Sequence, residues 1–168
     1  MKVKDLMIGC LYRVKKDVCL PKGTIVIIKG IDADNRFPER HLIGSATCLP
    51  VNSEDGFTYG VWVEYLEPIP LTPEILEKNG FYYGYTSNEE DLASNTIVQL
   101  SEDDKGWCWD EGCGAIKVIF PNEADGGMLV IDDQSFDRHL EFVYSATIYV
   151  HELQHAMRLL GIEKEIIL

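Results

Sequence analysis

The segment from His151 to His155, which reads H-E-L-Q-H, holds the residues best suited to chemistry in this chain. It matches the H-E-x-x-H signature of zinc peptidases. Histidines four positions apart lie on one side of a helix and can bind the same metal ion, and the glutamate between them can activate a metal-bound water. One interpretation is therefore a zinc-dependent peptidase with His151 and His155 as metal ligands and Glu152 as catalytic base.

A helix must carry these residues, and the sequence around them predicts one. Apolar residues at helical spacing form a single stripe. They are Ala146, Tyr149, Val150, Leu153, Ala156, Met157 and Leu160. Ser145 or Thr147 is suited to cap the start of this helix, and Gly161 to end it. At about 100° per residue, the histidines lie almost opposite the centre of the stripe. We therefore expect both imidazoles to point into solvent.

The number of available ligands argues against a catalytic zinc, which needs a third protein ligand besides an open position. The extended form of the motif requires Gly and His where this chain has Arg158 and Gly161. Downstream, Glu163 and Glu165 are too close to return over the site unless the tail folds back. The upstream donors, which have no motif of their own, are His139, Asp132 and Asp133. We therefore interpret the match as accidental and predict no catalytic residue, no metal ligand and no cofactor.

Composition points to a folded protein in a reducing compartment. The chain has 168 residues, of which 46% are hydrophobic, so it can form a core. No apolar run approaches the roughly 20 residues of a membrane span, and the start of the chain lacks the apolar region of a secretory signal. The number of cysteines is odd, at five, which favours free thiols. These features predict a cytoplasmic protein that does not enter a membrane.

The net charge of −13 is distributed unevenly. Residues 1–69 carry nine basic and nine acidic side chains, so the whole excess lies in residues 70–168. An acidic surface repels a phosphate backbone, and we therefore expect a protein partner, of unknown identity, and not a nucleic acid. The alternative is weak nucleic-acid binding through a basic face of the first part, which includes Lys15 and Lys16.

The pattern along the chain predicts an α+β protein in two parts. In residues 1–69, five short strands and one tight turn before the last strand are typical of an SH3-like β-barrel. The four longer strand candidates are Leu11–Val14, Thr24–Ile31, Leu42–Leu49 and Thr58–Val63, and a polar loop is expected at Asp32–Arg40. A proline-rich junction, Pro68–Pro70, then leads to a short helix capped by Thr72 and ended by Asn79 and Gly80.

Residues 70–168 are predicted to form an acidic α+β domain, a small antiparallel sheet packed with the amphipathic C-terminal helix. The strand candidates are Phe81–Thr86, Thr96–Leu100, Gly114–Phe120 and Met128–Ile131, with a hairpin turn at Asn122–Gly127. Phe136–Tyr144 fits a helix or a strand equally well. Trp107 and Trp109 flank Cys108 and are expected on one face of a strand, at the edge of the core.

Three segments carry a recognisable pattern. They are Asp5–Gly9, Leu66–Phe81 and Tyr149–His155, and the middle one, LEPIPLTPEILEKNGF, is the most specific. The chain resembles in these segments a family of small uncharacterised proteins carried by phages and mobile elements of gut bacteria. In that family the final helix often reads V-H-Q-L-Q-N, and the positions of Glu152 and His155 then lack metal chemistry. The resemblance implies an origin in a phage or integrated element and transfers no catalytic residue.

These observations lead to one leading hypothesis, a non-enzymatic accessory or interaction protein. The Leu-Gln pair inside the final helix is expected to pack and to hydrogen-bond within the fold, with Gln154 about a quarter-turn from the centre of the apolar stripe. The zinc-dependent peptidase and the weak nucleic-acid binder remain the alternatives.

Overall fold

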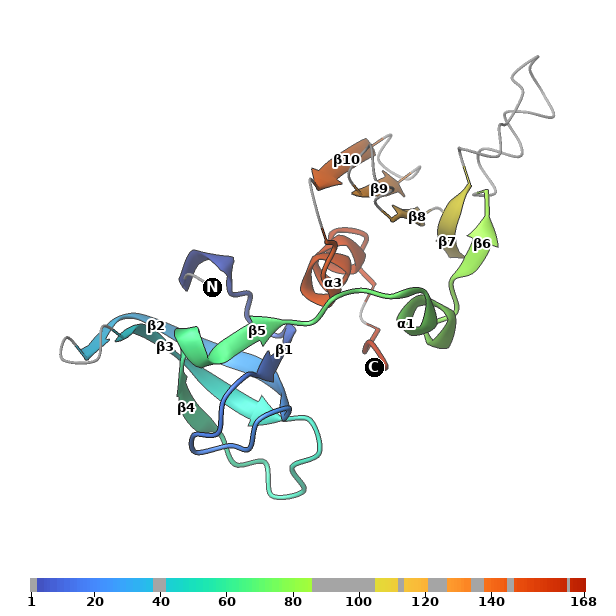
Figure 1. Cartoon of the computed structure of the whole chain (residues 1–168). Coiled ribbons are helices and arrows are strands. Elements are labelled where there is room, and N and C mark those ends of the chain that lie inside the picture. Colours follow the sequence, from blue (N-terminus) through green and yellow to red (C-terminus); the bar gives the residue numbers. More distant parts are fainter. Residues whose placement is uncertain are drawn as a thin grey trace, which may run out of the picture. The chain divides into compact units, whose positions relative to one another are not determined.

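The computed structural model describes residues 3–37, 42–85, 105–111, 114–120, 127–133, 138–144, 147–162 and 164–168. The chain divides into two compact units, Met1–Ile69 and Pro70–Leu168. Each unit contains a five-stranded antiparallel sheet, and the second also contains the helices α1 and α3 (Figure 1). This arrangement confirms the predicted mixed α+β class, with two antiparallel sheets and a C-terminal helix.

The sheet of the first unit has the strand order β4-β3-β2-β1-β5. Its elements are η1 (Val3–Asp5), β1 (Leu11–Val14), β2 (Ile25–Phe37), β3 (Leu42–Pro50), β4 (Tyr59–Trp62), η3 (Val63–Tyr65) and β5 (Leu66–Pro68). Every pairing is antiparallel, and β1 pairs with both β2 and β5. The predicted single turn before the last strand is therefore present, as the 3₁₀ helix η3 between β4 and β5.

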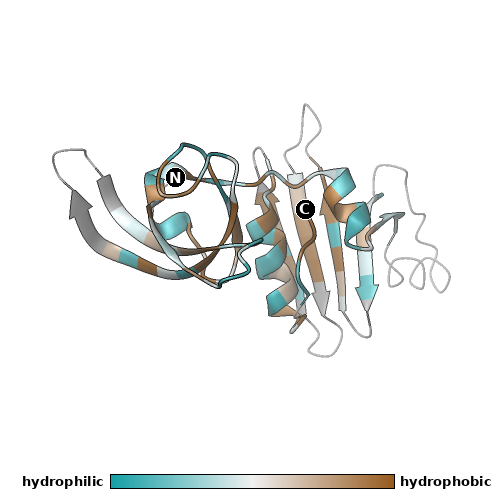
Figure 2. Ribbon diagram, turned by 90° about the horizontal axis from the view of Figure 1, so that it is seen from below, coloured by the Kyte–Doolittle hydropathy of each residue, from teal (hydrophilic) through white to brown (hydrophobic). Residues whose placement is uncertain are grey.

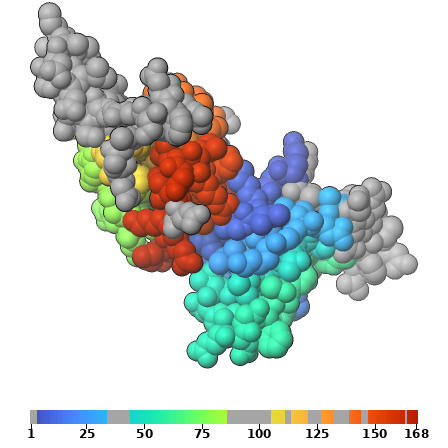
Figure 3. All heavy atoms as spheres, turned by 180° about the vertical axis from the view of Figure 1, so that it is seen from behind, coloured from blue at the N-terminus to red at the C-terminus, as the bar shows by residue number. Residues whose placement is uncertain are grey.

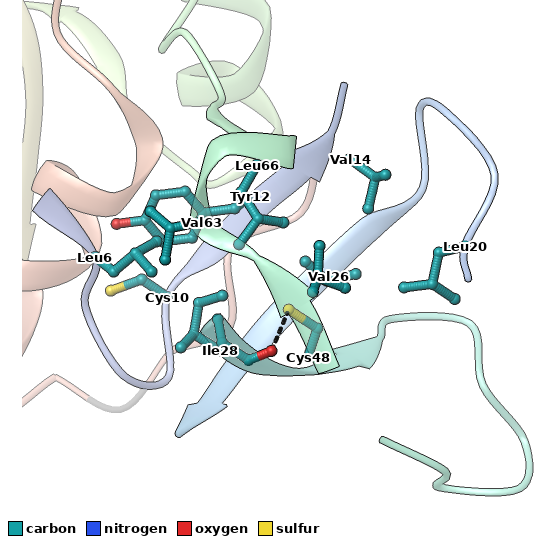
Figure 4. Packing of buried hydrophobic residues seen from close by; sticks show 12 residues of the cluster. Leu6, Cys10, Tyr12, Val14, Leu20, Val26, Ile28, Cys48, Val63 and Leu66 are labelled. Atoms are coloured by element: carbon teal, nitrogen blue, oxygen red, sulfur yellow. Dashed lines mark hydrogen bonds between the residues drawn. The ribbon is translucent and has the colours of Figure 1, made fainter. Parts of the chain in front are cut away.

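A compact apolar cluster fills the first unit (Figure 4). It includes Tyr12, Val14, Val26, Ile28 and Cys48, none of which has accessible surface. The buried phenol of Tyr12 remains satisfied because its hydroxyl donates to the Asp5 carbonyl at 2.9 Å and accepts from the Met7 amide at 3.2 Å. Burying apolar side chains from several strands together is what stabilises so small a sheet.

The predicted polar loop at Asp32–Arg40 is wrong from Asp32 to Phe37, because β2 continues to Phe37, and residues 38–40 lie outside the described residues. Residues Asp32, Arg36 and Phe37 pair with the start of β3, across an irregularity in register between Asp32 and Arg36. A second irregularity lies between Ile28 and Gly30. Such interruptions bend a strand, and pairing with β3 overrides the low strand propensity of this polar segment.

The second unit contains a five-stranded antiparallel meander in the order β10-β9-β8-β7-β6. Its strands are β6 (Tyr82–Gly84), β7 (Gly106–Glu111), β8 (Gly114–Ile119), β9 (Gly127–Asp133) and β10 (Arg138–Tyr144). Trp109, Ile116, Ile131 and Leu140 occupy one row of this sheet, and directly opposed residues share a face. Trp107 lies two residues before Trp109, so both tryptophans share that apolar face, as expected; Trp109 is buried and Trp107 partly buried.

Helices α1 (Pro73–Lys78) and α3 (Val150–Leu159) both lie on one side of this sheet (Figures 1 and 2). Ile116 and Ile131, which lie on the apolar face of the sheet, are fully buried, and so are Leu153 and Met157 of α3. Burial of all four requires a common core, so we infer that α3 packs against the face that bears Ile116 and Ile131.

Helix α1 begins and ends as its sequence predicts. The Thr72 hydroxyl accepts a hydrogen bond from the Ile75 amide at 3.4 Å, and Pro73 occupies the first helical position. At the other end Gly80 adopts a φ of 84°, and the amide of Phe81 donates to the Leu76 carbonyl at 3.1 Å. This is a Schellman-type ending, in which a left-handed glycine lets the chain leave the helix.

The last residues of the chain dock onto the end of α1. The buried side chain of Asn79 donates to the carbonyls of Ile75 at 2.7 Å and Ile167 at 2.8 Å, and accepts from the Ile167 amide at 2.9 Å. The Lys164 ammonium donates to the Asn79 carbonyl at 2.8 Å. One amide side chain therefore joins two segments about 90 residues apart in the sequence. It bonds both the N–H and the C=O of Ile167, as the backbone of a paired strand would.

Several predictions fall on residues outside the described ranges. These are the strand Thr96–Leu100, most of the turn Asn122–Gly127, and residues Ser145, Ala146 and Glu163. Phe136–Tyr144 proves to be a strand from Arg138 onwards. Among the described residues, no helix has the length and apolar character required to cross a membrane.

Candidate functional site

The H-E-L-Q-H motif lies at the start of α3 and not in its middle. The helix begins at Val150, so His151 and Glu152 occupy its second and third positions, and Tyr149 is the N-cap residue. The carboxylate of Glu152 accepts a hydrogen bond from the Tyr149 amide at 2.7 Å. This is one half of a capping box, which provides an acceptor for an amide that the helix itself leaves unbonded.

The N-cap position corrects the prediction that Ser145 or Thr147 caps this helix. Thr147 precedes the helix in extended chain, and Ser145 lies outside the described residues. Tyr149 is a poor intrinsic cap, and its phenol makes no hydrogen bond to the first turn. The backbone of Tyr149 forms a bridge with Pro70, and the neighbouring Ile148 carbonyl accepts from the Leu71 amide at 2.9 Å. This pairing, together with the Glu152 carboxylate and without the Tyr149 side chain, defines where α3 starts.

Glu152 is half-buried at this position. Burial raises the pKa of its carboxyl group above the usual value, and the hydrogen bond from the Tyr149 amide opposes that shift in pKa without cancelling it. A raised carboxyl pKa is also typical of a general base in a zinc peptidase, so the electrostatics alone do not separate the two roles. In this structure the carboxylate is held against the backbone at the start of its own helix.

The expectation that both histidines point into solvent is wrong for His151. This side chain is only 8% exposed, whereas His155, one turn later, is exposed. The His151 imidazole stacks on the ring of Tyr149, with ring centroids 5.8 Å apart and planes 18° apart. Helical periodicity places both residues opposite Leu153, but it gives no information on which neighbouring groups cover the first turn of the helix.

Because His151 is buried as well, the buried side of α3 covers a wide part of the helix circumference. Leu153, Ala156 and Met157 are buried as the apolar stripe predicts, and Gln154 is buried beside them at 9% exposure. Only the later residues on the opposite side, such as Arg158 and Leu159, are exposed. The segment that includes α3, coloured red in Figure 3, accordingly reaches the surface of the molecule over part of its length. A polar Gln154 inside the arc agrees with the structural role expected for it.

His139, the upstream donor whose side chain the structure describes, is not brought to the motif. His139 lies on β10 opposite Asp132, next to Leu140, which lies opposite Ile131. Because side chains alternate along a strand, His139 projects from the face opposite to the one that α3 covers. Its imidazole lies 3.0 Å from the Glu141 carboxylate on that same outer face. The side chains of Asp132 and Asp133 fall outside the described part of the chain.

The described downstream residues complete the end of the helix. The amide of Gly161, whose φ is 73°, donates to the Arg158 carbonyl at 3.0 Å, and the Ile162 amide donates to the Met157 carbonyl at 2.9 Å. Glu165 is exposed in the docked tail. Among the residues that the structure describes, no group of three or more His, Cys, Asp or Glu side chains is placed to hold a metal ion.

A second polar cluster, on the outer face of the sheet, was not predicted from the sequence. The Tyr82 hydroxyl donates to the Asp110 carboxylate, and the buried Lys117 places its ammonium 5.9 Å from the centre of the Tyr85 ring. The sequence signal for this cluster was Lys117, a polar residue in an otherwise apolar strand. Its side chain is buried because aromatic side chains and neighbouring strands cover its aliphatic part.

Comparisons of the chain with protein-family models, with curated proteins and with solved structures found no match.

Proposed function

We propose that this chain is a non-enzymatic interaction protein, and that it serves as an accessory protein of a phage or integrated element. The observation that supports this proposal is the hydrogen bond from the Tyr149 amide to Glu152, at 2.7 Å. The one residue of the motif suited to act as general base is engaged in starting the helix, and its two neighbouring histidines occupy different environments, one buried and one exposed.

Within this proposal the first unit is an SH3-like barrel. The strand order, the long β2 interrupted by two irregularities and the position of η3 before β5 all support it. Barrels of this kind commonly serve as interaction modules, an analogy that rests on fold alone. The second unit carries the whole net charge, so a basic protein surface is the partner it would attract.

The test compares Glu152→Gln with Glu152→Ala in a peptide-hydrolysis assay supplemented with one equivalent of zinc. Gln keeps an acceptor for the Tyr149 amide but cannot act as a base. We expect no zinc-dependent hydrolysis by the natural chain or by either variant. Glu74→Gln is the matched control, because Glu74 lies in the first turn of α1 and is exposed. Hydrolysis by the natural chain that only the Glu152 variants abolish would establish the peptidase.

Weak nucleic-acid binding, the other alternative, receives less support from the first unit. Lys16 places its ammonium 5.1 Å from the centre of the Tyr65 ring, so this cation already contacts an aromatic face of its own chain. We expect no retention on DNA or RNA at physiological salt. Retention that is lost when Lys15→Glu and Lys16→Glu are combined would overturn this expectation.

A further inference from the structure

Strand β10 is the longest edge strand in the described part of the molecule. It lies at one end of the second sheet and pairs with β9 over all seven of its residues without a break in register. The other edge strands, β4, β5 and β6, contain four, three and three residues. Short edges limit pairing with other chains, whereas a long regular edge presents a row of backbone donors and acceptors to a further strand.

The sequence of this edge also bears on its capacity to pair. Its sequence, RHLEFVY, contains neither proline nor lysine, the residues that most often block an edge. Leu140 is 41% exposed and Val143 is 75% exposed. Exposed apolar side chains on a regular edge gain by burial when another strand is added.

We propose that β10 is a homodimer interface, in which β10 of a second copy of this chain pairs antiparallel with it and extends the sheet across both copies. A two-fold axis relating two antiparallel edge strands must be perpendicular to the sheet, so it keeps each side chain on its own face. Directly opposed side chains in an antiparallel pair lie on the same face of the sheet. The axis must therefore pass between one residue and the same residue of the other copy. This condition leaves only a few registers to compare.

The pairing of His139 with Glu141 selects the register centred on Leu140. In it, His139 of each copy opposes Glu141 of the other, and Leu140 opposes Leu140. The His139 imidazole already lies 3.0 Å from Glu141 within one chain, and these side chains are 59% and 53% exposed. Two such pairs would form a four-membered cluster on the outer face in which imidazole and carboxylate alternate both along and across the strands.

The next two registers toward the C-terminal end of the strand fit less well. Centring on Glu141 places two carboxylates directly opposite each other, which destabilises a strand pair. Centring on Phe142 places Glu141 against the apolar Val143. The interface does not depend on the proposed interaction function, because a dimer forms by this edge whether or not the chain also binds another protein.

Cysteine cross-linking tests both the dimer and its register. In the full chain, with the exposed Cys19 and also Cys113 changed to serine, Leu140→Cys is expected to form a disulfide-linked dimer on mild oxidation. Glu141→Cys and Phe142→Cys report the competing registers, and Val143→Cys controls for exposure on the same strand. Cross-linking at Glu141→Cys or Phe142→Cys alone would overturn the proposed register. Cross-linking at none of them, with a monomer by sedimentation up to about 100 μM, would overturn the interface.

A charge exchange provides the second test. His139→Glu opposes a carboxylate to each Glu141 and should weaken the dimer about tenfold, because two cross-strand pairs change from attractive to repulsive. Adding Glu141→Lys to that variant restores opposite charges and should restore the dimer. If the double variant dissociates as readily as the single one, while circular dichroism shows both folded, the pairing of His139 with Glu141 between copies is refuted.

Discussion

The role of Glu152 in starting α3 can be measured as stability. Replacing Glu152 by alanine removes the acceptor that the described part of the chain provides for the Tyr149 amide. Leaving a partly buried donor unbonded costs about 1–3 kcal/mol, and removal of a capping side chain typically costs about 1 kcal/mol. We therefore expect Glu152→Ala to lower the free energy of unfolding by about 1–2 kcal/mol.

Glutamine at the same position should cost far less. Its side-chain oxygen still accepts from the Tyr149 amide, and what it loses is the charge. Burial raises the pKa of Glu152, so that charge is disfavoured in the folded state and its loss is offset. We expect Glu152→Gln to remain within about 0.5 kcal/mol of the natural chain at pH 7.

The pH dependence follows from the same shift. Because the pKa of Glu152 is higher in the folded than in the unfolded chain, its favourable contribution is fully present below the unfolded pKa and is lost as pH rises through the folded pKa. The natural chain should therefore be more stable relative to Glu152→Gln near pH 4 than at pH 7.

Urea denaturation of the three proteins at both pH values measures these differences. Thermal unfolding should agree, with a fall in Tm of about 3–6 °C for Glu152→Ala in a chain of this size. The capping role would be refuted if Glu152→Ala were as stable as the natural chain. It would also be refuted if Gln and Ala were equally destabilising, because only Gln preserves the acceptor.

Three further predictions concern metal and the two helix ends. After dialysis against a weak chelator, metal analysis of the purified chain should find no stoichiometric zinc; close to one equivalent, reduced by His155→Ala, would contradict this. Asn79→Ala removes three buried hydrogen bonds between α1 and the tail and should cost about 2–4 kcal/mol in urea denaturation, whereas Asn79→Asp, which keeps the acceptor for the Ile167 amide, should cost less. Gly161→Ala meets no atom within 4 Å but must adopt a φ of 73°, so it should lower stability by about 1 kcal/mol, while Gly60→Ala, equally open and without positive φ, should not.

Local signals in the sequence predicted the elements whose ends are set locally. Thr72, Pro73, Asn79 and Gly80 determine both ends of α1, and each acts through backbone groups within a few residues of itself. The extension of β2 through Asp32–Phe37 could not be predicted in this way, because those polar residues form a strand only through pairing with β3.

The candidate site likewise combines features that local sequence signals predict with features that depend on the surrounding fold. The position of the motif on a helix and the burial of Leu153 follow from periodicity. The burial of His151 does not, since it depends on where the helix starts and on the ring of Tyr149 stacked beside it. Tyr149 has a low intrinsic preference for the N-cap, so nothing in its own chemistry indicated that α3 begins there.

The place of a short motif within its helix decides which chemistry its glutamate can perform. At the third helical position a glutamate side chain reaches back to the N-cap amide, which has no other acceptor in the helix. In the middle of a helix every backbone amide is already bonded, so the same carboxylate is left to orient a water on a metal. Because α3 begins at Val150, Glu152 falls at the capping position. Of α3, only Val150 precedes His151, so the place of the motif within its helix favours the capping role of Glu152 over a catalytic one.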